Sequence, residues 1–209
     1  DGLILRADVY RPVADGKFVG LLGGEHSVTL GAVRALSAAR QGRPISFLQI
    51  DAHLDLRDSY EGSPFSHACI ARRLLEHGNL VQVGVRVGCP EELAVVREHG
   101  LEPIWGHEAA SQPPAVWIAR ALEQLGPEVY VTLDVDGLDP AVMPATGTPV
   151  PGGLGWYAAL ALLRAVGEAR RIVGCDLVEL APAPGMHGAD YAAALLLYKM
   201  IGYFVPPRG

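Results

Sequence analysis

Short apolar runs alternate with longer stretches of helical periodicity along most of this chain of 209 residues. The runs are nearly unbroken in apolar character, as in strands that a sheet buries on both faces, and they lie at 18–22, 45–50, 80–85, 102–105, 129–133 and 172–177. Helical spacing follows at 27–40, 67–77, 90–99, 114–125, 154–168 and 189–204. The repeated order of strand and helix predicts a three-layer α/β fold, in which helices cover both faces of a mainly parallel sheet.

The length suits one domain, and neither an internal repeat nor a low-complexity linker divides the chain. The first sixteen residues fit the alternation poorly. A strand at 3–5 is followed too soon by Arg11, Pro12 and Gly16 for a crossover helix. We therefore expect a single domain over 1–209 whose N-terminal end is incomplete.

Composition excludes several classes of partner. A formal net charge of −6 without a Lys/Arg cluster argues against nucleic acid. No uncharged apolar run reaches the roughly 18 residues of a membrane-spanning helix, so we expect no membrane association. The three cysteines, Cys69, Cys89 and Cys175, are odd in number and widely spaced. They favour the reducing cytoplasm over a disulfide framework.

Acidic residues and histidines gather where the expected strands end. In an open α/β sheet, ligands bind beyond the carboxyl ends of the strands, so these positions are candidates for a site. They are Glu25 and His26 after the first strand, Asp51, His53 and Asp55 after the second, Asp134 and Asp136 after the fifth, and Glu179 after the sixth.

The alternation of Asp51, His53 and Asp55 would point all three side chains to one face of an extended strand. An extended chain would separate the first and last Cα atoms by about 13 Å, which is too far for one compact site. We therefore expect the strand to end near His53 and the chain to curl, bringing Asp55 back toward Asp51. A lone Asp at a strand end usually caps a turn, but capping does not explain this clustering.

So many like charges at one edge would repel one another unless positive charge arrives, and divalent cations are the simplest source. An oxygen-rich donor set with some nitrogen suits Mn²⁺ better than Zn²⁺. Two ions about 3.5 to 4 Å apart could share the donors and acidify a water held between them, which indicates a hydrolase. The candidate ligands are His26, Asp51, His53, Asp55, Asp134 and Asp136.

The charge of such a centre narrows the substrate. Four carboxylates, two divalent ions and one bridging hydroxide leave a negative centre, which favours a cationic substrate. A metallophosphatase is the weaker alternative, because such enzymes need Lys or Arg clamps and the motif segments offer only Arg57.

These segments resemble the ureohydrolases, the family of arginases and agmatinases, from about residue 17 to residue 203. The resemblance rests on three separated motifs in the family's order, with Thr-Gly-Thr-Pro at 146–149 and Gly-Gly at 152–153 after them. The motifs are Gly-Gly-Glu-His-Ser at 23–27, Asp-Ala-His-Leu-Asp at 51–55 and Asp-Val-Asp-Gly-Leu-Asp-Pro at 134–140. Glu25 stands where Asp is more usual.

The resemblance implies hydrolysis of a guanidino compound to urea and an amine, by attack of a metal-bridging hydroxide, on an eight-stranded parallel sheet. It implies two Mn²⁺ per subunit. His26, Asp51, Asp55 and Asp134 would bind one ion, and Asp51, His53, Asp134 and Asp136 the other. It further implies a homo-oligomer, a trimer or hexamer.

The resemblance also assigns roles beside the metal ligands. Glu179 would pair with the planar guanidinium, Asp55 would orient the hydroxide, and His67 would give a proton to the leaving amine. Thr148 is a candidate substrate contact, with a plain turn hydroxyl as the equal alternative. Asp139 is expected to fix its turn rather than to bind metal.

The stretch 60–69 lacks the arginase pattern that receives an amino-acid head group, and this favours agmatine. Arginine, guanidinopropionate and guanidinobutyrate stay open, with Arg86 as the cation near the carboxylate of a guanidino acid. A catalytically silent ureohydrolase-like interaction protein is the rival function class. The remaining histidines, His77, His99, His107 and His187, are expected to be solvated or to cap helices.

Overall fold

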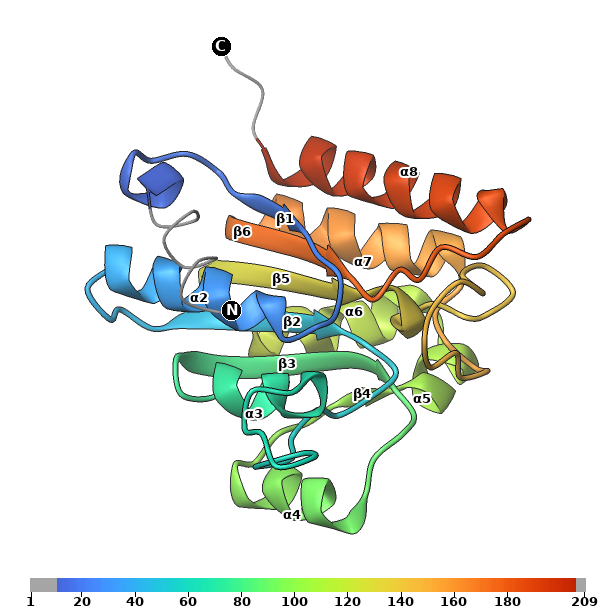
Figure 1. The fold of residues 1–209 in the computed structure, drawn as a ribbon, viewed down its shortest axis with the longest axis horizontal. Helices are drawn as coiled ribbons and strands as arrows, with labels where there is room; N and C mark the ends of the chain where they lie inside the picture. The colour runs from blue at the N-terminus through green and yellow to red at the C-terminus, as the bar shows by residue number, and fades with distance from the viewer. Residues whose placement is uncertain (1–10, 206–209) are drawn as a thin grey trace.

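In a computed structural model, which describes residues 11–205, six strands form one parallel sheet (Figure 1). The sheet order is β1-β6-β5-β2-β3-β4, and each of the six expected strands is confirmed. The strands are β1 (Gly20–Leu22), β2 (Ile45–Ile50), β3 (Gly78–Val85), β4 (Ile104–Trp105), β5 (Glu128–Asp134) and β6 (Arg171–Val178).

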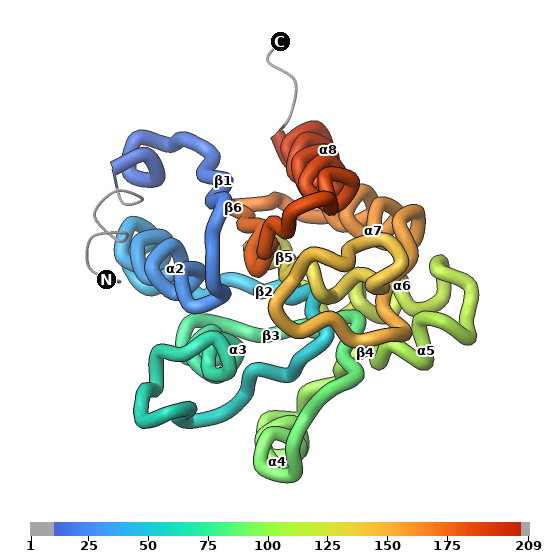
Figure 2. Tube along the Cα trace, turned by 45° about the vertical axis from the view of Figure 1, so that its right-hand side comes forward, coloured from blue at the N-terminus to red at the C-terminus, as the bar shows by residue number. Residues whose placement is uncertain are grey.

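Helices cover both faces of the sheet, so the predicted three-layer α/β architecture is confirmed (Figures 1 and 2). One layer holds α2 (Val28–Ala39), α3 (Ile70–Leu74) and α4 (Pro90–Glu98), whose apolar side chains pack in one core cluster. The other layer packs in a second cluster. It contains α6 (Pro114–Gln124), α7 (Trp156–Ala169) and α8 (His187–Phe204), with the short helix α5 (Gly106–Ser111) beside them.

The central strands have the expected environment. All six residues of β2 are buried, and β5 and β6 are buried along most of their length. Burial on both faces explains why these strands are continuous in apolar character rather than alternating. The resemblance implied eight strands, whereas the described residues contain six. The strand expected at 3–5 lies outside the described residues.

Several helix ends differ from the sequence prediction. Ser27 precedes α2 but makes no capping bond, because its hydroxyl donates instead to Glu25. The helix expected at 67–77 is a 3₁₀ turn (His67–Cys69) followed by α3, which ends at Leu74. The helix expected at 154–168 begins at Trp156, and α8 begins two residues earlier than expected. The sequence analysis missed α5, whose short pattern has only one buried residue, Gly106.

The strand order determines where a site can form. From β2 the chain passes to its neighbour β3 on one side, whereas from β5 it passes to β6 on the other side. The carboxyl ends of β2 and β5 therefore form a topological switch point, where open α/β sheets bind ligands. Asp51 directly follows β2 and Asp134 ends β5. Within residues 11–205, no helix is both long and apolar enough to cross a membrane.

Candidate metal centre

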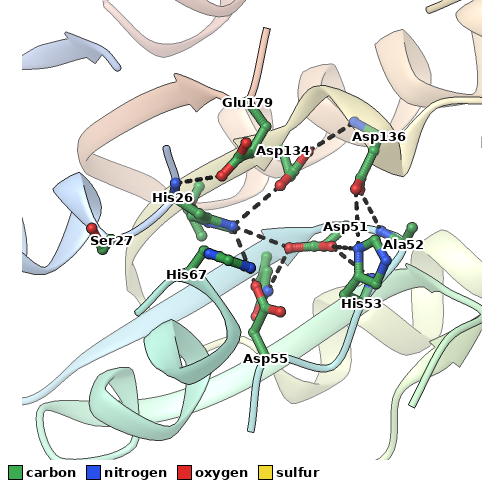
Figure 3. Close-up of polar contacts among 12 residues, drawn as sticks. His26, Ser27, Asp51, Ala52, His53, Asp55, His67, Asp134, Asp136 and Glu179 are labelled. Carbon is green, nitrogen blue, oxygen red and sulfur yellow. Dashed lines mark hydrogen bonds and ion pairs between the residues drawn. The ribbon is translucent and has the colours of Figure 1, made fainter. Parts of the chain in front are cut away.

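The six candidate metal ligands converge at this switch point (Figure 3). Asp51, His53 and Asp55 lie on the loop after β2, and Asp134 and Asp136 lie at the end of β5 and in the following 3₁₀ turn (Val135–Gly137). His26 comes from the segment between β1 and α2. Residues more than 100 positions apart thus share one site, and the structure brings together all six predicted ligands.

The imidazole of His26 lies at the centre of one group. Its Nδ1 atom is 3.2 Å from Oδ2 of Asp51, 3.4 Å from Oδ2 of Asp55 and 3.3 Å from Oδ2 of Asp134. Asp55 reaches this position because its backbone adopts a left-handed conformation with φ of 53°. The expected curl of the chain after β2 is therefore present.

This group fits a metal ion better than a hydrogen-bonded cluster. His26 is fully buried, and Nδ1 makes no hydrogen bond with any residue that the structure describes. A buried polar atom without a partner is unusual in a folded protein, and here three carboxylate oxygens surround it without bonding to it. One imidazole nitrogen facing several carboxylate oxygens is a donor set that suits a divalent cation.

A second group lies beside the first and shares Asp51 with it. His53 Nδ1 is 3.0 Å from Oδ2 of Asp136 and 3.5 Å from Oδ1 of Asp51. The ligand atoms of Asp51, His53 and Asp136 all lie within 4.8 Å of one another, as do those of His26, Asp51 and Asp134. The side chains can therefore hold two ions, with Asp51 common to both groups.

Local hydrogen bonds hold the carboxylates in these orientations. Asp51 accepts a bond from the backbone N–H of His53 at 2.6 Å, and Asp134 accepts one from that of Asp136 at 2.8 Å. Asp136 accepts a bond from the N–H of Ala52 at 3.0 Å, which ties the two loops together. The loops approach closely at Gly137, where an added Cβ would lie 2.8 Å from the backbone N of Asp51.

Crowding of the carboxylates shifts their ionisation. Burial and the charge of Asp51 raise the pKa of Asp55 and of Asp134. Burial alone would lower the pKa of His53, but Asp136 and Asp51 raise it to about 11. Burial alone would likewise lower the pKa of His26, yet the facing carboxylates of Asp134, Asp51 and Asp55 raise it well above the usual value. The crowded carboxylates therefore favour positive charge beside them, which bound cations can supply.

A cavity of about 450 Å³ opens beside the two groups. Among the described residues that line it, the only Lys or Arg is Arg57, against six carboxylates. The ring of Tyr60 lies beside Arg57, 5.3 Å from its guanidinium carbon. The carboxylates are Glu25, Asp55, Glu92, Asp134, Asp136 and Glu179, and the cavity is therefore suited to a cation.

The other predicted site residues also line this cavity. Glu179 has a left-handed backbone with φ of 65°, and its Oε1 accepts the backbone N–H of His26 at 2.6 Å. Thr148 donates its hydroxyl to Oδ2 of Asp136 at 3.1 Å. His67 lies at the rim, half exposed, where Oε1 of Glu25 is 3.0 Å from its Nδ1 atom.

Two residues beside the site have structural roles. Arg86 does not line the cavity, because its guanidinium donates to the backbone carbonyls of Gly84, Asp136, Leu138 and Val150. It clamps the loop after β5, so the suggestion that it receives a substrate carboxylate is wrong for this conformation. Asp139 fixes its turn as expected, with Oδ1 accepting the N–H of Ala141 at 2.9 Å.

Some relevant residues were missed by the sequence analysis. Thr132 contacts His26, and Gln49 donates to Asp51 at 2.8 Å. Both are polar residues inside otherwise apolar strands, and that interruption was the available signal. For Glu25, the sequence showed only that it stands where Asp is more usual, and its contact with His67 was not foreseen. The four histidines that are expected to be solvated or to cap helices, His77, His99, His107 and His187, do not line the cavity in the described structure.

The chain is similar to several known proteins. Residues 4–202 match a family model described as the arginase family. The chain is 43% identical over 194 residues to a Synechocystis protein named N(1)-aminopropylagmatine ureohydrolase, covering 92% of this chain and 62% of that protein. It is 40% identical over 182 residues to a Pyrococcus horikoshii agmatinase, covering 87% of this chain and 61% of the relative.

A solved structure is similar as well. The agmatine ureohydrolase of Thermoplasma volcanium superposes with a TM-score of 0.84 at 32% identity, covering 97% of this chain and 69% of that one. The chain thus spans somewhat less than two thirds of the length of the Synechocystis and Pyrococcus relatives.

Proposed function

The chain belongs to the arginase family, and on that premise we propose that it is a manganese-dependent ureohydrolase that cleaves an agmatine-like guanidino compound to urea and an amine. The observation that carries this proposal is the position of His26 Nδ1, which lies within 3.4 Å of three carboxylates and has no hydrogen-bond partner among residues 11–205. Carboxylate and imidazole donors in this proportion favour Mn²⁺ over Zn²⁺.

Each proposed ion has its own set of ligands, with two carboxylates shared. His26, Asp51, Asp55 and Asp134 would hold one ion, and Asp51, His53, Asp134 and Asp136 the other. When bound, two such ions supply Lewis acidity that lowers the pKa of a coordinated water toward neutrality. The side chains around them then need to bind the substrate, orient it and move protons.

Glu179 is the proposed partner of the guanidinium. A guanidinium stays protonated at any working pH and offers a planar fork of N–H donors, which a two-oxygen carboxylate matches. The bond from the backbone N–H of His26 to Oε1 holds the carboxylate of Glu179 next to the ligand groups. The guanidinium carbon of the substrate would thereby lie next to the carboxylates that the two ligand sets share.

Two further residues are proposed to handle protons. A free oxygen of Asp55 would accept a hydrogen bond from the nucleophilic water and orient it. His67, at the rim of the same cavity, would donate a proton to the nitrogen that leaves as the amine. The hydroxyl of Thr148 already donates to Asp136, so its proposed contribution is to hold that ligand and to narrow the cavity beside the substrate.

The cavity favours a substrate without a carboxylate. Six acidic side chains and one arginine line it, and the guanidinium of Arg86 donates to backbone carbonyls instead. A guanidino acid or arginine would bring a negative group to these carboxylates, whereas agmatine brings a second positive charge. The identity of 43% to a protein named for N(1)-aminopropylagmatine makes that longer polyamine the second candidate substrate.

The test is a urea-release assay on the manganese-loaded protein, using agmatine, N(1)-aminopropylagmatine, arginine, guanidinobutyrate and guanidinopropionate. We expect urea from one or both of the two amines and at least about tenfold lower kcat/KM for the three acids, the effect of 1.4 kcal/mol of unfavourable charge contact. Release of urea from an acid in preference to both amines would refute the substrate assignment. No urea from any of the five would favour the catalytically silent class.

A further inference from the structure

A series of buried hydrogen bonds runs from the candidate metal centre into the layer between the sheet and α2. Nε2 of His26 lies 2.8 Å from the hydroxyl oxygen of Thr132. That hydroxyl donates to Oδ1 of Asp176 at 2.6 Å, and the hydroxyl of Tyr130 donates to Oδ2 at 2.8 Å. All four side chains are at most 1% exposed.

The register between β5 and β6, and the room left by a glycine, allow these hydrogen bonds to form. Thr132 on β5 pairs with Asp176 on β6, so their side chains lie side by side on one face of the sheet. Tyr130 has room for its ring because Gly174 lies beneath it, where an added Cβ would be 2.9 Å from the ring. Buried carboxylates are costly unless they are hydrogen-bonded. Asp176 therefore needs both hydroxyls.

The direction of the hydrogen bonds fixes the state of His26. Because the single hydroxyl proton of Thr132 is donated to Asp176, the oxygen of Thr132 can only accept from the imidazole. Nε2 must then carry a proton, which leaves the lone pair of a neutral ring on Nδ1. Nδ1 is the atom that faces Asp51, Asp55 and Asp134.

We propose that Asp176 and Thr132 are positioning residues for the metal centre, which hold His26 in the ring orientation and tautomer that present Nδ1 to the ion. The inference rests on the proposed metal centre, and it names residues outside the ligand set. Partners that orient a ligating histidine in this way contribute about 10- to 100-fold to metal affinity. Because this series of hydrogen bonds ends at His26, we expect it to affect the ion that His26 would bind and not the other ion.

Thr132→Val is the sharpest test, because it keeps the shape of the side chain and removes only the hydroxyl that contacts Nε2. Mn²⁺ is titrated into the metal-free full chain, and the two affinities are measured by calorimetry and by the electron paramagnetic resonance of free Mn²⁺. We expect one affinity to fall about 10- to 100-fold and the other to stay unchanged. Thr132→Ser retains the hydroxyl and restores the wild-type value.

Asp176→Asn tests the direction of the bonds. The new amide can donate to the oxygen of Thr132, which frees the hydroxyl proton to point at Nε2 and favours the other tautomer of His26. The same single affinity is expected to fall, although the residue has kept its size. Tyr130→Phe removes one donor to Asp176 but leaves its bond to Thr132, so its effect is smaller.

Ser46→Ala is the matched control. Ser46 is a buried hydroxyl of β2 that bonds Asn79 and the N–H of Gly126, away from the ligands. It is expected to lower the thermal stability of the metal-free chain, as Thr132→Val does, while leaving both Mn²⁺ affinities unchanged. Unfolding of every variant is followed in EDTA, so that loss of fold and loss of metal are separated.

The outcomes distinguish this inference from the proposed function. If the unsubstituted chain binds no pair of Mn²⁺ ions, the metal centre and the positioning role are both refuted. If it binds two and Thr132→Val and Asp176→Asn bind both as tightly, only the positioning role is refuted. An equal weakening of both ions also overturns it, because that result indicates general loosening of the site.

Discussion

Oε1 of Glu25 accepts the backbone N–H of His67 at 2.7 Å and lies 3.0 Å from the Nδ1 atom of the same residue. Burial alone would raise the pKa of Glu25, but the hydrogen bonds from Ser27 and His67 lower it below its usual value. An ionised carboxylate only accepts, so Nδ1 of His67 carries a proton, and Nε2 is the ring nitrogen that can pass a proton to the substrate when both nitrogens are protonated. Glu25 and His67 thus form an acid–imidazole pair at the rim of the cavity.

The first prediction concerns the imidazole of this pair. His67→Ala is expected to lower kcat about 10²- to 10⁴-fold, the usual contribution of a positioned general acid, because the leaving amine then takes its proton from water. Bound Mn²⁺, measured by elemental analysis, should not change, since His67 is outside the ligand groups. Unchanged turnover in the variant would rule out the proton-donor role.

A second prediction concerns the coupling of Glu25 to His67. Glu25→Gln keeps the size and one acceptor oxygen but removes the charge that favours a protonated Nδ1. We expect kcat to fall about tenfold, equivalent to the roughly 1.4 kcal/mol of one weakened charge-assisted hydrogen bond. In the double variant with His67→Ala, the losses should not add, because Glu25 acts through His67. Full additivity would show that the two residues act separately.

Removal of His53 should separate the two metal sites. Partners that merely orient a ligand are worth about 10- to 100-fold in affinity, so His53→Asn is expected to weaken one Mn²⁺ by at least as much. The ion that contacts His26 should be retained. Equilibrium dialysis measures both affinities, and His99→Asn, an exposed imidazole outside the cavity, is the matched control. Equal loss of both ions would contradict the division into two ligand sets.

The pH dependence of stability can be tested far from the metal centre. Glu128 at the start of β5 pairs with Arg40 after α2 and with Arg171 at the start of β6. The hydrogen bond from Arg40 is the main cause that lowers the pKa of Glu128 below its ordinary value of 4.5. A lowered folded-state pKa means that this stabilisation is complete above pH 4.5 and is lost as the pH falls through the folded value.

Glu128→Gln is therefore expected to reduce the free energy of unfolding by about 1 kcal/mol at pH 7, with a difference that shrinks below pH 4.5. Urea unfolding at pH 7 and at pH 3 measures both values. Glu168→Gln, which breaks the exposed pair with Arg164, is the control and should change stability little at either pH. A difference that grows on acidification would contradict the direction of the pKa shift.

The six strands could be predicted because a strand that is buried on both faces is a short run of mainly apolar residues in the sequence, as at Ile45–Ile50. The meeting of Asp51 and Asp134 could be predicted too, since the carboxyl ends of parallel strands share one edge of a sheet. The uncapped start of α2 could not. The hydroxyl of Ser27 bonds Glu25, and Glu25 is held in turn by the backbone N–H of His67, a residue 42 positions away that reaches it only after folding.

The amino-acid sequence alone determined the α/β class and the six donor side chains, because apolar periodicity and the chemistry of Asp and His are local properties of the chain. Only the tertiary structure decided that Nδ1, and not Nε2, of His26 faces the carboxylates, and that Arg86 is committed to backbone carbonyls. These facts depend on which residues lie opposite one another across β5 and β6 and between distant loops. That pairing follows from the packing of the whole sheet, and it cannot be predicted from any short segment of the sequence.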